Sequence, residues 1–132
     1  MINADVLLSG DTLIYAAGHG TDRRHPGDNI LNNAMTARID AIAQSLNIQY
    51  NMGLTGIPRT LRIGSDHGAF FYAGHTVVWL LGGGYTGSSF SLEFLHDASD
   101  YIQNINANAP GRMERNMRAF SIFLEELLLM RG

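Results

Sequence analysis

The amino-acid sequence predicts an α/β domain, a layered sheet with flanking helices. Three observations favour this class: short apolar stretches rich in β-forming residues, longer segments whose apolar residues recur at helical spacing, and the alternation of the two along the chain. A chain of 132 residues is long enough to bury a hydrophobic core, so we expect residues 1–132 to form one domain.

Three strands are expected. Residues 5–8 and 12–17 are apolar, and residues 9–11 between them have the sequence Ser-Gly-Asp, which is typical of a tight turn. Residues 75–81 form a continuous apolar run, which predicts a strand covered on both faces. The glycines at 82–84 are expected to end that strand.

The first expected helix follows a polar, glycine-rich loop. Asp28 is a favourable N-cap, and apolar residues then recur every three or four positions until the pattern ends near Asn47. The predicted apolar stripe consists of Leu31, Met35, Ile39, Ile42 and Leu46. Residues 48–63 contain glycines and a proline and are expected to be mostly loop.

Two further helices are expected. Ser65 or Asp66 can cap a short helix that Gly74 ends. A long helix begins after Pro110, and its predicted apolar stripe consists of Met113, Met117, Phe120, Leu124 and Leu127. Residues 85–108 are expected to be mostly loop with one short helical turn.

The composition excludes several functional classes. Without lysine there is no Schiff-base chemistry and no phosphate-binding loop of the Walker type, and without cysteine there is no thiol catalysis or disulfide. The net charge is −3 and the arginines are scattered, so no nucleic-acid partner is expected. The apolar run at 76–81 is too short to cross a membrane, and no membrane partner is expected.

Histidine and carboxylate side chains are therefore the remaining candidates for acid–base catalysis or metal binding. The loop from His19 to Asp28 holds two histidines and two aspartates at regular spacing, but a solvated turn is the better interpretation because a Gly/Pro-containing loop fixes no geometry. Ser65, Asp66 and His67 are adjacent, so their side chains point in different directions and do not form a catalytic triad.

His96, Asp97 and Asp100 form a more promising group. They follow the last buried strand, which is where α/β folds place their sites. A histidine close to carboxylates has the residue types of a metal ligand with orienting partners. An ordinary surface turn is the alternative interpretation.

Read together, the segments resemble the zinc aminopeptidases of metallopeptidase family twenty-eight. Asn3-Ala4-Asp5-Val6 resembles the strand end whose Asp binds metal, and residues 65–70 resemble the Ser-Asp-His-x-x-Phe motif, followed by Gly74 and an apolar strand. Residues 95–100 match a His-x-x-x-Asp segment whose His is a metal ligand. The amphipathic C-terminal helix fits as well.

This resemblance implies the C-terminal half of a zinc-aminopeptidase-like domain, with a phosphorylase/hydrolase-like fold. Such an enzyme holds two zinc ions with five protein ligands, of which Asp5 and His96 have counterparts here. The resemblance further implies that Asp97 and Asp100 support the metal ligands and that Asp66 shapes the pocket. No catalytic residue has a counterpart, because the family's Glu-Glu pair would precede Asp5.

The expected function is therefore zinc-dependent hydrolysis of peptide substrates from their N-terminus, by a domain of which this chain supplies the C-terminal half. The half alone is expected to be inactive and to self-associate through the sheet edge and apolar face that the other half would cover. The alternative, from a different class, is a non-catalytic interaction or ligand-binding module that has lost its metal site.

Overall fold

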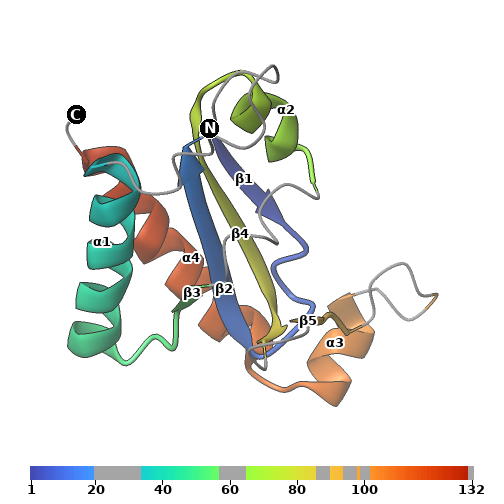
Figure 1. Cartoon of the computed structure of the whole chain (residues 1–132). Helices are drawn as coiled ribbons and strands as arrows, with labels where there is room; N and C mark the ends of the chain where they lie inside the picture. The colour runs from blue at the N-terminus through green and yellow to red at the C-terminus, as the bar shows by residue number, and fades with distance from the viewer. Residues whose placement is uncertain (20–33, 57–64, 86–89, 94–97, 99–101, 131–132) are drawn as a thin grey trace.

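The computed structural model describes residues 1–19, 34–56, 65–85, 90–93, 98 and 102–130. They form the expected α/β fold, an open mixed sheet with flanking helices (Figure 1). The strands are β1 (Ile2–Asp5), β2 (Thr12–His19), β3 (Thr55–Gly56), β4 (Thr76–Tyr85) and β5 (Phe90–Ser91). The helices are α1 (Ala34–Tyr50), α2 (His67–Tyr72), α3 (Ile102–Asn108) and α4 (Arg112–Leu129).

Strand β4 is the centre of the sheet. The strand order is β1-β4-β2-β3, and β4 runs parallel to β1 and antiparallel to β2, while β5 pairs with the end of β4. Val77, Val78, Leu80 and Leu81 of β4 are each at most 4% exposed. The predicted burial of this strand on both faces is therefore confirmed.

One face of the sheet carries the larger core. Figure 1 shows α1 and α4 side by side against this face. Alternate residues of β2 and β4 point toward the helices, as the period of a strand requires. This core consists of Leu13, Tyr15, Ala17, Leu54, Val78 and Leu80 with Ile39, Ala43 and Leu46 of α1 and Ala119, Phe123 and Leu127 of α4. The predicted stripe of α1 is confirmed at Ile39 and Leu46.

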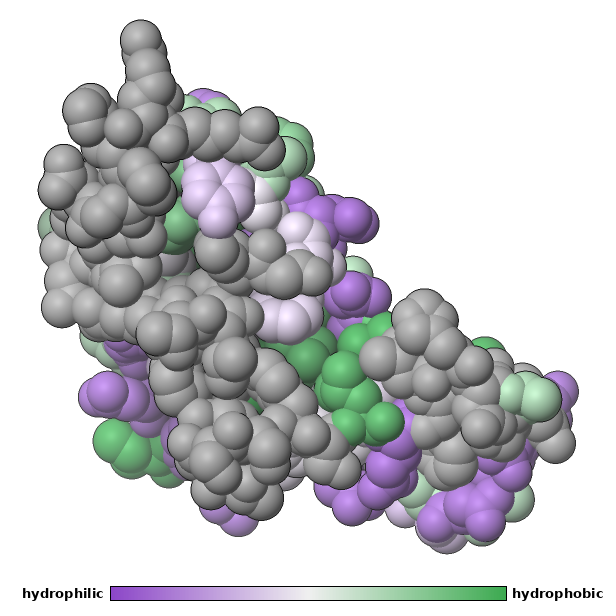
Figure 2. Space-filling view, turned by 45° about the vertical axis from the view of Figure 1, so that its right-hand side comes forward, coloured by the Kyte–Doolittle hydropathy of each residue, from purple (hydrophilic) through white to green (hydrophobic). Residues whose placement is uncertain are grey.

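The opposite face has a smaller apolar cluster. Ile14, Ala16 and Leu81 are buried there, and Val6, Trp79 and Leu92 pack against them. Figure 2 looks toward this side of the sheet, and apolar side chains gather near the centre of the view. None of the helices in the described part of the chain has the length and apolarity that crossing a membrane requires.

The predicted apolar stripe of the C-terminal helix is confirmed at Leu127, which is buried, and at Phe120, which packs against the core, but it is wrong at Met113 and Met117. In α4 the buried residues are Arg112, Asn116, Ala119, Phe123 and Leu127, while Met113 and Met117 are 37% and 40% exposed. The buried face begins with two polar residues because their side chains bind groups in the segment between β1 and β2. A pattern of hydrophobic residues alone favours the neighbouring methionines instead.

The predicted N-terminal strand over residues 5–8 is also wrong. Strand β1 ends at Asp5, and Val6 adopts a positive φ of 39°, which takes the chain out of the sheet. Residues 6–11 then form a turn in which the Ser9 N–H donates to the Val6 carbonyl at 3.0 Å.

The glycines at 82–84 lie inside β4 and do not end it, contrary to the prediction. The turn after β1 packs backbone to backbone against them. A Cβ on Gly82 would overlap the carbonyl of Leu7, and a Cβ on Gly10 would overlap the backbone of Gly83. Glycine is therefore required for close approach, which is one reason for glycine within a strand.

The remaining helices and strands agree with the sequence-based prediction only in part. Gly74, with φ 84°, ends α2 as predicted, but Asp66 makes no side-chain cap hydrogen bond. The segment predicted to be mostly loop contains β5 and the seven-residue helix α3. Leu31 and the predicted cap Asp28 lie outside the described residues.

We predict that Gly82→Ala lowers the free energy of unfolding by about 3 kcal/mol, because the new methyl group meets backbone that no side-chain rotation can move. Gly53→Ala is the control: its Cβ has room, with Thr12 Cγ2 at 3.9 Å, so only its positive φ costs free energy, about 1 kcal/mol. Urea denaturation measures both. Equal losses would contradict the close-contact explanation.

Candidate functional site

Of the two predicted metal ligands, Asp5 and His96, only Asp5 is among the residues that the structure describes. It is the last residue of β1, and Asn3 lies two positions before it, so both side chains project from the same face of the strand. Both side chains are half-buried. The strand thus presents a carboxylate and an amide next to each other.

The residues that precede α2 meet this pair. The Ser65 hydroxyl donates to Asp5 Oδ2 at 3.2 Å, across 60 residues of sequence. The Asn3 side-chain amide donates to Ser65 Oγ at 3.3 Å and lies 3.4 Å from His67 Nδ1. The two sequence segments, Asn3–Val6 and Ser65–Phe70, are therefore joined in one hydrogen-bond network at the β1 edge of the sheet.

His67 is the buried member of the network. Its side chain is fully buried, and its ring stacks on Trp79 with centroids 5.0 Å apart. Burial lowers the pKa of His67 below the ordinary 6.5, against the opposing charges of Asp66 and Asp5. Because the Asn3 amide is a donor, Nδ1 is the acceptor of a neutral ring whose proton is on Nε2.

Asp66 takes a different position from its neighbours. Its side chain is exposed, and its charge acts on His67 from the start of α2. The structure therefore places Asp66 beside the network, and its role in shaping a pocket stays a prediction.

His96, Asp97 and Asp100 lie outside the described residues, as do the loop residues Asp22 and His25. Within the described part of the chain, no three His, Asp or Glu side chains come together as a possible metal site. A structural zinc site uses four protein ligands and a catalytic site three. The described residues alone therefore do not fit a zinc ion, and Asp5 is at most one ligand of a larger set.

A second polar cluster was not anticipated from the sequence. The buried Arg112 guanidinium binds Asp11 Oδ1 at 3.0 Å and Glu93 Oε2 at 2.8 Å. Burial alone would lower the Arg112 pKa, but the bonds to Asp11 and Glu93 outweigh it and raise the pKa. Asn116 donates to the carbonyls of Leu7 and Gly10 at 2.7 and 2.8 Å.

These contacts fix the turn after β1 to the start of α4. The sequence signal that could have revealed them is the pair Arg112 and Asn116, which are four residues apart and so share one face of the helix. Their partners are carbonyls and carboxylates of the turn and of Glu93, so the cluster is a structural support and not a reaction site.

Compared with protein-family models, curated proteins and solved structures, the chain shows no significant match. The interpretation of the Asp5 network therefore depends on its own geometry and on the resemblance of its sequence segments.

We predict that the protein loses stability as the pH falls below about 6.5, the ordinary pKa of histidine. Below this pH His67 binds a proton in the unfolded chain but not in the folded protein. The loss of stability therefore continues until the pH falls below the lowered pKa of His67 in the folded state. Denaturation measured at a series of pH values follows this loss, and NMR of the folded protein follows the His67 ring directly.

His67→Gln should flatten the pH dependence in this window, because glutamine does not titrate. His75→Gln, at an exposed histidine just after α2, is the matched control and should leave the slope in place. If His67 in the folded protein titrates at or above 6.5, the buried neutral ring is wrong.

Proposed function

We propose that this chain carries the C-terminal half of a zinc-dependent aminopeptidase domain, in which Asp5 and His96 are metal ligands. The observation that supports this most is the contact between Asp5 and Ser65, since each belongs to a sequence segment that resembles the family independently. The α/β sheet with flanking helices is compatible with such a domain.

The chain's own residues would hold and orient the first ligand. Ser65 binds one carboxylate oxygen of Asp5, and Asn3 binds Ser65, which fixes the direction of the carboxylate at the end of β1. Carboxylate and imidazole ligands suit a hydrolytic metal site. The chemistry that zinc supplies in such a site is a lowered pKa of bound water and a polarised scissile carbonyl.

The β1 edge of the sheet supports the proposal that this chain is half of a domain. Strand β1 stands at the end of the strand order, and within the described residues it pairs only with β4. Its outer edge can accept a further strand, from the remainder of the domain or from a second copy. Asp97, Asp100 and Asp66 remain the proposed supporting residues of the metal site.

We predict that zinc binds the 132-residue chain weakly and without a defined stoichiometry, whereas the chain extended by its preceding genomic residues binds two ions. Isothermal titration calorimetry measures both. Asp5→Asn should abolish binding at one of the two sites of the extended chain, and Asp66→Asn, with an exposed side chain, is the matched control. Tight, stoichiometric binding by the short chain would contradict the half-site.

A peptide hydrolysis assay distinguishes the proposed aminopeptidase from the non-catalytic alternative. The extended chain should release the N-terminal residue of a peptide, and His96→Ala should abolish this activity while circular dichroism shows a retained fold. The alternative is a non-catalytic interaction or ligand-binding module that has lost its metal site, and it predicts no release of the N-terminal residue. No activity in an extended chain that contains the Glu-Glu pair would overturn the enzyme proposal.

A further inference from the structure

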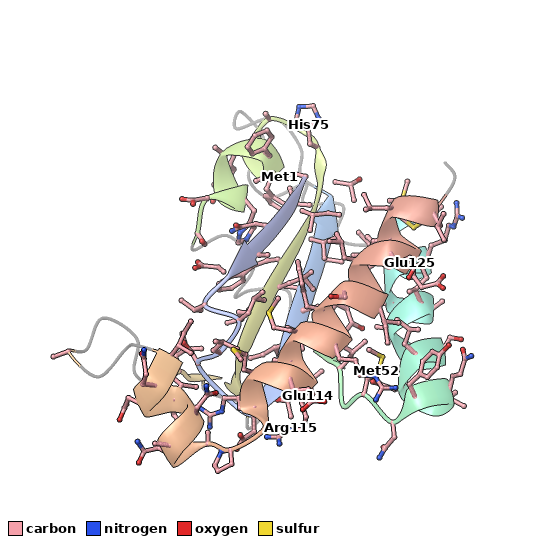
Figure 3. All side chains as sticks on the ribbon, turned by 180° about the vertical axis from the view of Figure 1, so that it is seen from behind. Met1, Met52, His75, Glu114, Arg115 and Glu125 are labelled. Carbon is pink, nitrogen blue, oxygen red and sulfur yellow. The ribbon has the colours of Figure 1, made fainter. Side chains whose placement is uncertain are left out.

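A pocket lies on the helix face of the sheet, between the end of α1 and the first half of α4. Its volume is about 240 Å³. Figure 3 shows Met52 and Arg115, which contribute to opposite sides of it, near the same end of the helix pair. Tyr50, Asn51 and Met52 line one side, and Arg115, Arg118 and Ala119 line the other. None of these residues belongs to the Asp5 network.

The α1 side of the pocket is held in place before any ligand binds. Asn47 uses both ends of its side-chain amide on Leu54, at 2.7 Å to the carbonyl and 2.7 Å to the N–H. The Asn51 N–H donates to the Asn47 carbonyl at 3.0 Å, and Asn51 has a φ of 50°, which turns the chain away from α1. These bonds fix the backbone of residues 50–54.

The α4 side supplies positive charge. Arg115 and Arg118 are three residues apart and share a face of the helix. Arg115 donates to the Pro110 carbonyl at 3.3 Å and lies 3.4 Å from Asp11, whose carboxylate Arg112 also binds. Arg118 forms no ion pair with any described residue, including Glu114 one turn before it. No described carboxylate therefore competes with a ligand for its guanidinium.

The other side adds neutral donors. The Tyr50 hydroxyl accepts from Gln49 Nε2 at 2.9 Å, so its own proton is available to donate. Asn51 carries a side-chain amide with two N–H groups. Met52 and Ala119 contribute apolar surface between these donors. The described lining residues carry no negative charge, and the nearest described carboxylate in contact with them is Asp11, which pairs with Arg115.

We propose that this pocket binds the phosphate group of a small phosphorylated molecule. Arginine presents its N–H groups in a planar fork that matches phosphate, and Arg118 supplies a positive charge that no described carboxylate neutralises. The pocket is larger than a bare phosphate, and its apolar part accommodates the body of the molecule that carries the group. This site is independent of the proposed peptidase function and needs no metal.

The test is an NMR titration of the 132-residue chain with phenyl phosphate and, separately, with inorganic phosphate. Both are expected to shift the amides of residues 50–52 and 115–119 with a saturating curve, phenyl phosphate the more tightly. Sodium chloride at the same ionic strength should not. Inorganic phosphate binding as tightly as phenyl phosphate would overturn the small-molecule part of the proposal.

Arg118→Gln should weaken phenyl phosphate binding about tenfold or more, because it removes a charged, two-bond contact. Arg38→Gln, on α1 and outside the pocket, is the matched control and should leave binding unchanged. An equal loss in the two variants, or shifts that sodium chloride reproduces, would show only nonspecific attraction of an anion and would overturn the site.

Discussion

The close contact between the turn after β1 and the glycines of β4 is the constraint on which the arrangement of the other elements depends. Leu7 and Gly10 lie against Gly82 and Gly83 with no room for a side chain between them. The turn begins directly after β1 ends at Asp5, where Val6 has a φ of 39°. The same turn offers its carbonyls to Asn116, so it also decides which face of α4 packs against the sheet.

The described residues present two regions with different chemistry. At the β1 edge, Asn3, Asp5, Ser65 and His67 form a network with one carboxylate and a neutral imidazole. On the helix face, the arginines of α4 line a pocket near the end of α1. The two proposals follow these charges: Asp5 is proposed as one ligand of a larger metal site, and the arginine-lined pocket is proposed to bind a phosphate group.

The sequence resemblance and the geometry support different parts of the proposed function. Asp5 could be chosen from the sequence only because it stands in a segment that resembles the family, whereas Ser65, in a second such segment, is predicted only as a helix cap. Their hydrogen bond could not be predicted from spacing, since 60 residues separate them. The burial of His67 beneath Trp79 likewise depends on how α2 packs against β4.

The sequence by itself determined the α/β class, the burial of β4 on both faces and the end of α2 at Gly74, because local hydrophobic patterns and glycine conformation decide these features. Only the tertiary structure decided that Gly82–Gly84 continue a strand and that Arg112 and Asn116 are buried while Met113 and Met117 are exposed. The physical reason is that a buried polar side chain needs a partner, and its partners here come from the other end of the chain.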